Sequence, residues 1–587
     1  MTRQTLLCLF SIAVASAQTG ANVYVQHNLI SSVPGIADVT DPNLIDPWGM
    51  SFSTTSPFWI SNHGKGNTTL YSNASSTAIP TISATVVAIP SGSAGPTPSV
   101  PTGQVQNSTT GFLLANGTKA SFIFCTEDGT ISAWNGGTVA TVMVDYSSIG
   151  TVYKGMAIGT GSGAPLLYAA NFSYGKIDVF DTNFKLATTA GGFTDPNLPA
   201  GYGPFNIWPV NGQLYVTYAK QNSAKNEDQA GVGNGVVDIY DFNGNLVKRL
   251  TAGGPLNSPW GVAFSSGSWG AFPSAVLVGN FGDGHINAFD PGTGNLLGTL
   301  QTAAGAPIAI QGLWAIEFGN GGSAGDPNYL YFTAGIFNNG VAAGLLGSIA
   351  PQAQITQVQN AANALRGSIA PGEIVTLSGI TVGPRPAVSS PSMTTAVNAT
   401  TSLGGTSVTV NGTPAPILYA QADFTNIIVP WGVTGTTATI VVTTTGPAAA
   451  TTATQAFQVP LGTAAPGVFN SVAFNQDGTQ NTAANPAAAG SVVVQYVTGL
   501  GVTDPPLLDG ARSGSLVLAE AVAPVTATIG GQAAMVVYAG SAPGQIAGVM
   551  QVEMVVPAGA GTGPVPLVLT AGGVSSLTGA SSAIYLK

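Results

Sequence analysis

The first 350 residues contain a pattern that repeats about every fifty residues, and large or polar side chains recur at the same position of each repeat. Short apolar strands begin at residues 47, 101, 153, 204, 259 and 313, which are steps of 54, 52, 51, 55 and 54 residues. Each start is followed by one residue of interest: Trp48, Thr102, Lys154, Phe205, Trp260 or Trp314. Four aromatic rings at one repeat position favour stacking on sugar rings or on other flat apolar surfaces.

A second set of polar side chains lies in the tight turn that follows each strand pair. The set comprises Asn62, His63, Glu127, Asp128, Asn171, Asn280 and Asp283. Amides and carboxylates beside aromatic rings could orient a ligand. The sequence therefore predicts ligand-binding residues at Trp48, Lys154, Phe205, Trp260, Trp314, Glu127, Asn171, Asn280 and Asp283. The alternative is that the tryptophans are packing wedges between repeats.

No catalytic residue is predicted. A calcium-dependent hydrolase or lyase would need hard oxygen ligands that converge on one point. The weak candidates for such a Ca²⁺ are Asn62, Glu127, Asn171 and Asn280, and we otherwise expect no cofactor. The chain has no G-x-S-x-G motif, and His27, His63 and His285 have no evident partner in the sequence.

The regular spacing indicates how these side chains are positioned. Six near-equal units of about fifty residues match one four-stranded propeller blade each. The second half of each unit, such as FCTEDGTISAW or VGNFGDGHINAF, is typical of a strand, a tight turn and a second strand of alternating apolar and polar residues. The sixth unit is short by one strand, and residues 22–30 can supply it and close the ring.

The composition changes from about residue 352 to a mixture rich in Ala, Val, Thr, Gly and Pro. VTVNGTPAPILYA from Val408 parallels ATIGGQAAMVVYA from Ala527. The sequence therefore predicts an all-β chain, a six-bladed β-propeller followed by two immunoglobulin-like β-sandwich repeats. The expected parts are a signal peptide at 1–17, the propeller at 18–350 and the sandwiches at 351–465 and 466–587.

Composition and charge restrict the class of partner. Only 6% of the residues are charged and the net charge is −10, which excludes the clustered cations that nucleic acid requires. A short apolar run before Ala15-Ser16-Ala17 predicts a secreted chain, and no run is long enough for a transmembrane helix. Cleavage there would leave Cys125 as the remaining cysteine, which we predict to be buried and inert.

Two resemblances add to this interpretation. DPNLIDPWGM, TEDGTISAW, LNSPWGVAF and VGNFGDGHINAFD resemble a family of secreted bacterial propellers related to NHL repeats, which has no assigned activity. Residues 354–587 resemble a C-terminal module of secreted proteins of soil bacteria through APGEIVTLSG, VTVNGTPAPILYA and IIVPWG. Neither resemblance implies a catalytic residue.

We therefore expect a secreted or cell-surface binding protein. Its propeller funnel would bind an extracellular ligand, either carbohydrate or a partner protein, and its C-terminal module would serve adhesion or spacing. The alternatives are a lactonase-like, calcium-dependent enzyme on the funnel and a purely structural cell-surface component. An enlarged hairpin from Lys220 to Gly235 holds Lys225, Glu227 and Asp228, and we expect it to be a solvated surface loop.

Overall fold

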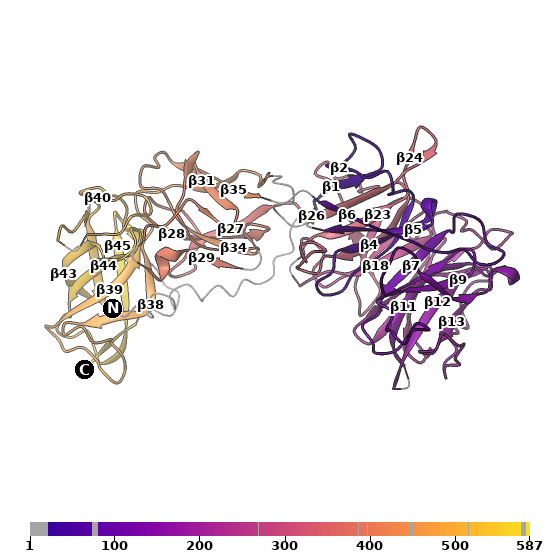
Figure 1. The fold of residues 1–587 in the computed structure, drawn as a ribbon. Coiled ribbons are helices and arrows are strands. Elements are labelled where there is room, and N and C mark those ends of the chain that lie inside the picture. The colour runs from indigo at the N-terminus through magenta and orange to yellow at the C-terminus, as the bar shows by residue number, and fades with distance from the viewer. Residues whose placement is uncertain are drawn as a thin grey trace. The chain divides into compact units, whose positions relative to one another are not determined.

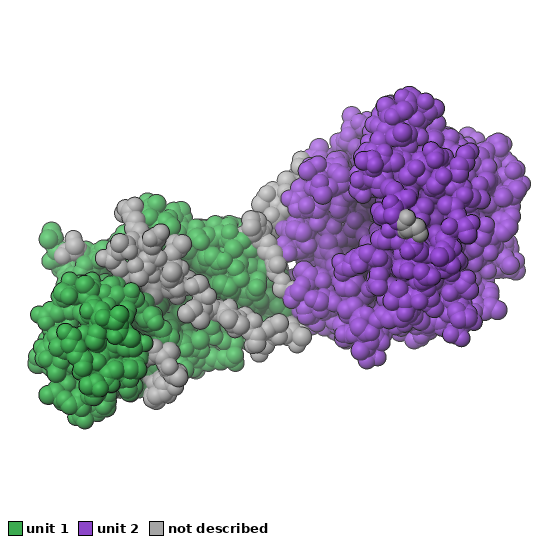
Figure 2. Space-filling view, turned by 90° about the horizontal axis from the view of Figure 1, so that it is seen from below, with its two compact units in different colours: residues 1–20, 352–445, 451–587 green, residues 21–351, 446–450 purple. Residues whose placement is uncertain are grey.

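A computed structural model describes residues 22–72, 80–161, 163–267, 269–384, 387–395, 397–445, 451–514, 516–576 and 583–587. The signal peptide predicted at 1–17 lies outside these residues. The described residues form two compact units, which meet in the sequence between Pro351 and Gln352 (Figure 2). Both units are built of strands (Figure 1), so the all-β prediction is confirmed. None of the described segments is a helix with the length and hydropathy needed to cross a membrane.

The first unit consists of sequential antiparallel sheets. The first sheet contains β3 (Pro47–Ser51), β4 (Phe58–Asn62), β5 (Asn67–Ser72) and β6 (Thr81–Ala88). The second contains β7 (Pro101–Gln106), β8 (Phe122–Thr126), β9 (Thr130–Trp134) and β10 (Thr141–Asp145). The third contains β11 (Tyr153–Gly161), β12 (Ala164–Asn171) and β13 (Lys176–Phe180).

The remaining sheets repeat this order. The fourth contains β14 (Tyr202–Val210), β15 (Gln213–Lys220), β16 (Val236–Asp241) and β17 (Leu246–Ala252). The fifth contains β18 (Pro259–Phe264), β19 (Val276–Asn280), β20 (Ile286–Phe289) and β21 (Leu296–Thr299). The sixth contains β22 (Leu313–Phe318), β23 (Leu330–Ala334), β26 (Leu345–Pro351), β1 (Tyr24–Ser31) and β2 (Val39–Thr40).

The first strands of the sheets form a closed ring. Each of β3, β7, β11, β14, β18 and β22 contacts the next, and β22 contacts β3. β1 pairs antiparallel with β26, from Tyr24 opposite Pro351 to Ser31 opposite Leu345, so the N-terminal strand completes the last sheet. A ring of mostly four-stranded sheets closed in this way is the pattern of a β-propeller and covers the sheet edge.

A β-bulge near the start of every inner strand sets the direction of the repeated side chains. The pairing of β3 with β4 shifts between Pro47 and Met50, and the other inner strands shift at the corresponding position. A bulge leaves its extra residues unpaired and turns their side chains away from the regular alternation. The residues at the six bulges are Trp48, Thr102, Lys154, Phe205, Trp260 and Trp314.

Glycines after four of these six residues let the inner strands approach one another. A Cβ at Gly49 would lie 2.5 Å from the carbonyl oxygen of Thr102 on the next inner strand. A Cβ at Gly155 would lie 2.2 Å from Oδ1 of Asn206. Because a real Cβ does not approach another atom so closely, only glycine fits where the strands crowd together.

Cys125 lies in β8 with no exposed surface. Burial raises the pKa of its thiol to about 12, so the thiolate that would react is not formed near neutral pH. The prediction that this cysteine is buried is confirmed.

The second unit begins with two facing sheets. One contains β27 (Gln354–Asn360), β28 (Ile374–Ile380), β34 (Phe424–Ile428), β33 (Ile417–Gln421) and β29 (Val388–Ser389). The other contains β30 (Ser402–Leu403), β31 (Thr406–Val410), β32 (Thr413–Pro414), β35 (Thr437–Thr445), β36 (Thr451–Ala453) and β37 (Phe457–Pro460). Val375 and Leu377 of the first sheet and Val408 and Ile440 of the second are buried in one shared core.

The second repeat differs from the predicted sandwich, because its described strands form one continuous sheet. The strands are β38 (Gly467–Asn475), β39 (Val492–Thr498), β40 (Thr503–Asp504), β41 (Glu520–Ala521), β42 (Val525–Ile529), β43 (Gln532–Ser541), β44 (Met550–Val555), β45 (Gly563–Ala571), β46 (Val574–Ser575) and β47 (Ala583–Leu586). β43 pairs with both β42 and β44, so the sheet wraps around its core almost as a barrel does.

Prolines explain the difference between the two repeats. In the first repeat the stretch equivalent to β43 is broken into β32 and β33, and it holds Pro414 and Pro416. A proline has no N–H to donate to a ladder, which disfavours a strand that continues between the two sheets. The second repeat has Ala533 and Met535 at these positions, and its strand is unbroken.

The two repeats pack together in one compact unit. β37 ends at Pro460 and β38 begins at Gly467, on either side of the predicted boundary near 465. Ile374 and Ile428 of the first repeat share a buried cluster with Phe469 and Val549 of the second.

Candidate functional site

Lys154 lies among the bulge residues and is completely buried. Its Nζ is 5.1 Å from the centroid of the Trp48 ring and 5.7 Å from that of the Phe172 ring. The indole Nε1 of Trp260 donates to the carbonyl oxygen of Lys154 at 3.1 Å. Side chains from the first, third and fifth sheets therefore meet at this lysine.

A chain of alternating charges extends from Lys154. Its Nζ forms an ion pair with Oε1 of Glu127, and a second with Oε2 of Glu227 at 2.7 Å. The other oxygen of Glu127 is 2.7 Å from Nε2 of His63. Nδ1 of His63 is in turn 3.0 Å from Oδ2 of Asp46. We call these five residues, from four sheets of the ring, the ionic network.

The ionic network holds its buried members in their charged forms. Burial favours the neutral form of each side chain, but the interactions with oppositely charged partners are stronger than this effect of burial. Hydrogen bonds to Asp46 and Glu127 raise the pKa of His63 to about 9. Lys154 and His63 lower the pKa of Glu127 to about 2. The pKa of Lys154 is raised, against its burial, chiefly by Glu127 and then by Glu227.

These charged forms favour binding over proton transfer. A general base or nucleophile needs a pKa near the working pH, whereas the pKa of Lys154 lies above its ordinary value. Glu127 is too weak a base at a pKa of about 2, and its two oxygens already serve Lys154 and His63. The arrangement is suited to fixing charges in place.

The predicted aromatic residues come together, but their rings are not exposed. Trp48, Trp260 and Trp314 are 4%, 4% and 3% exposed, and Phe205 is fully buried. Trp48 stacks on Trp314 at 3.5 Å between centroids, and Phe281 stacks on Trp314 at 4.1 Å. Stacking of a ligand on these rings would need open ring faces, whereas the rings are buried against one another.

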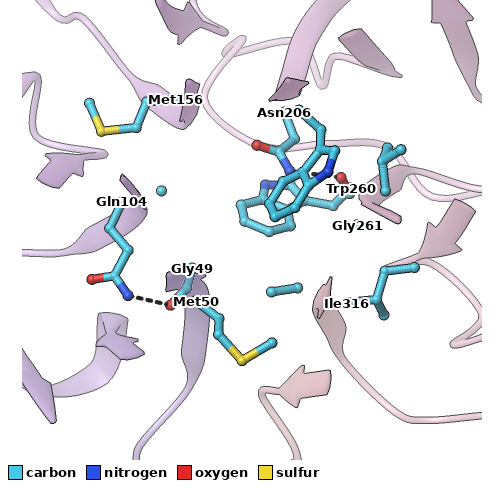
Figure 3. Close-up of a pocket in the computed structure, with 12 residues that line it drawn as sticks. Gly49, Met50, Gln104, Met156, Asn206, Trp260, Gly261 and Ile316 are labelled. Carbon is cyan, nitrogen blue, oxygen red and sulfur yellow. Dashed lines mark hydrogen bonds between the residues drawn. The ribbon is translucent and has the colours of Figure 1, made fainter. Parts of the chain in front are cut away.

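A narrow cavity lies among the inner strands (Figure 3). Its volume of about 20 Å³ has room for about one water molecule. Nε2 of Gln104 donates to the carbonyl oxygen of Gly49 at 3.2 Å, and Nδ2 of Asn206 donates to that of Trp260 at 2.9 Å. The cavity is too small to hold a sugar.

The amide nitrogens of the predicted asparagines donate within their own sheets, whereas the amide oxygens of Asn62 and Asn280 are buried and have no partner among the described residues. Nδ2 of Asn62 donates to Thr69 at 3.0 Å, and Nδ2 of Asn171 donates to Asp178 at 2.7 Å. Nδ2 of Asn280 donates to Oδ1 of Asp283 at 3.1 Å, so this predicted pair is joined within one hairpin.

The calcium alternative lacks a free carboxylate among its four candidates. Of its four candidates, Glu127 is in the ionic network while the three asparagines hold hairpin turns. Across the described ranges, no three His, Cys, Asp or Glu side chains gather in a way that could hold a metal ion.

Three members of the ionic network, Asp46, His63 and Glu227, are absent from the predicted ligand-binding residues. His63 has two carboxylate partners, and His27 and His285 also face Asp38 and Asp283. The hairpin from Lys220 was expected to be a solvated loop, yet its Glu227 reaches the buried Lys154. The available signal was the concentration of charge in one enlarged hairpin of a chain with few charges.

The shifted pKa of His63 gives a prediction about pH. Its folded pKa of about 9 exceeds the ordinary 6.5, so its stabilising contribution is complete below pH 6.5 and is lost as the pH rises through 9. Glu127 has a folded pKa of about 2 against an ordinary 4.5, so its contribution is lost as the pH falls below 4.5.

We therefore expect the parent protein to melt above the His63→Gln variant by the widest margin between about pH 4.5 and 6.5. The two melting temperatures should converge above about pH 9. Burial and Asp195 raise the pKa of Asp238 to about 7, but this group is present in both proteins and cancels. Thermal unfolding from pH 3 to 10 measures the difference, and a margin independent of pH would contradict the prediction.

Comparison with known proteins finds relatives of uncharacterized function. No family model matches the chain. The chain is 33% identical over 334 residues to uncharacterized protein R648 of Acanthamoeba polyphaga mimivirus, covering 55% of this chain and 78% of that protein. It is 31% identical over 300 residues to uncharacterized protein L690 of the same virus, covering 49% and 76%. These relatives are viral, so the expected bacterial family is not what the comparison finds.

Solved structures resemble the chain only weakly. The structure of streptogramin B lyase covers 55% of this chain and 97% of its own, with 14% identity and a TM-score of 0.28. The complex of the GH93 α-L-arabinofuranosidase of Fusarium graminearum with arabinobiose covers 56% and 98%, with 10% identity and a TM-score of 0.34. Scores of this size carry no conclusion about what this chain does.

Proposed function

This chain belongs to the same family as the uncharacterized mimivirus proteins R648 and L690, and we propose that it is a secreted binding protein. In this proposal the first unit is a six-bladed propeller. It binds an extracellular ligand, carbohydrate or protein, at the face where the ionic network lies. The second unit, two immunoglobulin-like repeats, serves adhesion or spacing.

The concentration of charge in the ionic network carries the proposal. The chain has 14 cationic Lys and Arg residues and 24 acidic residues in 587, yet five charged side chains from four sheets meet at one place. Burying charges is costly, and apolar residues of similar volume would stabilise a fold as well or better. Perturbed pKa values around such a cluster are typical of functional sites.

The rival functions have different support. A lactonase-like hydrolase would need a metal or a free base, and His63, Glu127 and Lys154 are instead paired in their charged forms. A purely structural role is favoured by one observation, the burial of all three tryptophan rings at the bulges. That role explains the rings but not the buried charges.

The test is retention on immobilised ligands. We expect the full-length protein to bind a member of a panel of polysaccharides and extracellular proteins. His63→Gln should weaken binding about tenfold, because a hydrogen bond to a charged group is lost. His27→Gln is the matched control, since His27 of β1 forms a similar pair with Asp38 and is not a member of the ionic network. Equal effects of the two substitutions, or no retention of the parent, would contradict the proposal.

A further inference from the structure

The hairpin between β15 and β16 covers Lys154. Residues 221–235 connect these strands, whereas Thr126 and Thr130 end and begin the corresponding strands of the second sheet. The hairpin is held to itself, since the amide of Asn222 donates to the carbonyl oxygen of Glu227 at 2.8 Å. It is held to the next sheet by Ser258, whose hydroxyl donates to Oδ2 of Asp228 at 2.5 Å.

Glu227 is the member of the network that is most open to solvent. Its side chain is 51% exposed, against 14% for Glu127 and none for Lys154. Burial and the charge of Glu127 raise the pKa of Glu227, although Lys154 acts to lower it. The inner carboxylate is therefore firmly held, while the outer one lies where solvent and solutes reach it.

A second donor beside Lys154 has no partner. Nε1 of Trp48 is buried and forms no hydrogen bond among the described residues. The Trp48 side chain is 4% exposed, and its ring lies 5.1 Å from Nζ of Lys154. A buried N–H without an acceptor is uncommon in a folded protein, and an oxygen from a bound molecule would satisfy it.

From this arrangement we propose that Glu227 occupies an anion site that a ligand carboxylate takes over. The inference rests on the proposed binding function and names its chemistry: a small molecule with one carboxylate displaces Glu227 from Nζ of Lys154. The exchange replaces one carboxylate by another, so no uncompensated charge is left at the lysine. The net charge of −10 disfavours a polyanion, which would be repelled as a whole.

Acetate tests the site without knowledge of the natural ligand. The full-length Glu227→Ala variant is melted at pH 7 in rising acetate, and in chloride of equal ionic strength. We expect acetate to raise its melting temperature saturably, and the parent to need about tenfold more acetate because its own Glu227 competes. If Glu227→Ala does not fold, Glu227→Gln serves with the same expectation. An equal effect of chloride would overturn the proposal.

A double variant shows where acetate acts. Lys154→Met combined with Glu227→Ala removes the ammonium, so the specific effect of acetate should disappear. Persistence of the effect would place acetate elsewhere and overturn the proposal. Galacturonate should replace acetate in Glu227→Ala, whereas galactose, its neutral counterpart, should not. An equal effect of galactose would overturn the assignment of a carboxylate.

The two proposals can fail separately. A specific rise in the melting temperature of Glu227→Ala in acetate, without retention of the parent on any immobilised ligand, would support the carboxylate site and contradict the binding function. Retention that depends on His63, without a specific effect of acetate on the melting temperature of Glu227→Ala, would support the binding function and contradict the carboxylate site.

Discussion

Replacing Glu127 with glutamine should lower the free energy of unfolding of the propeller by about 3–5 kcal/mol, the cost of breaking a buried ion pair. Glu127 is the shared partner of Lys154 and His63, one at each carboxylate oxygen. Glutamine keeps the shape but removes the charge. Lys154 then retains Glu227, whose half-exposed carboxylate compensates less well in solvent.

Denaturant unfolding followed by tryptophan fluorescence measures this effect. Seven of the eight tryptophans lie before residue 352, and Trp431→Phe removes the other, so the signal reports the propeller. Glu227→Gln is the matched control and should cost no more than about 1 kcal/mol, because the Glu227 carboxylate is half-exposed and Lys154 keeps Glu127 as its partner.

A double variant identifies the cause of the loss. Adding Lys154→Met to Glu127→Gln removes the stranded ammonium, and His63 keeps Asp46 as its partner. The double variant should therefore recover most of the lost stability, since an apolar pair often replaces a buried ion pair without cost. A double variant as unstable as the single one would show that the ionic network is not what Glu127 supports.

The repeated strands could be predicted because their signals are local. The expected starts at Pro47, Pro101, Tyr153, Pro259 and Leu313 coincide with the starts of β3, β7, β11, β18 and β22. Spacing, turn residues and alternation act within a few residues of each strand. The closure by β1 followed from the missing strand of the sixth unit.

The contacts of the site could not be predicted, because they depend on how the ring closes. Glu127 is 64 residues from His63 and 27 from Lys154, and Glu227 is 73 residues from Lys154. No local pattern in the sequence specifies these pairs. The bulges could not be predicted from the sequence either. Whether the aromatic rings are open or buried depends on these register shifts between strands.

The continuous sheet of the second repeat has a signal in the sequence, the absence of two prolines that the first repeat contains. Aligning the repeats places Pro414 and Pro416 opposite Ala533 and Met535. A strand free of proline can donate along its whole length, whereas the two prolines of the first copy each remove a donor. Two repeats of similar pattern therefore need not have the same sheet connectivity.

The second large effect is expected from Trp314→Ala, which should cost the propeller about 3–5 kcal/mol. The side chain is 3% exposed and stacks with Trp48 and Phe281. It also meets Trp260 edge-on at 5.9 Å between centroids. Removing this ring leaves a cavity that three large neighbours cannot fill without leaving their rotamers.

Scanning calorimetry of the full-length chain measures the loss on the transition of the propeller. Phe337→Ala is the matched control, because Phe337 is 61% exposed and its loss should change stability by no more than about 0.5 kcal/mol. Trp314→Phe should lie between the two, since it keeps a ring in the stack. A loss below about 1 kcal/mol for Trp314→Ala would mean that the cluster is not packed as a wedge. The aromatic residues would then be free to stack on a ligand, as the repeat pattern alone suggests.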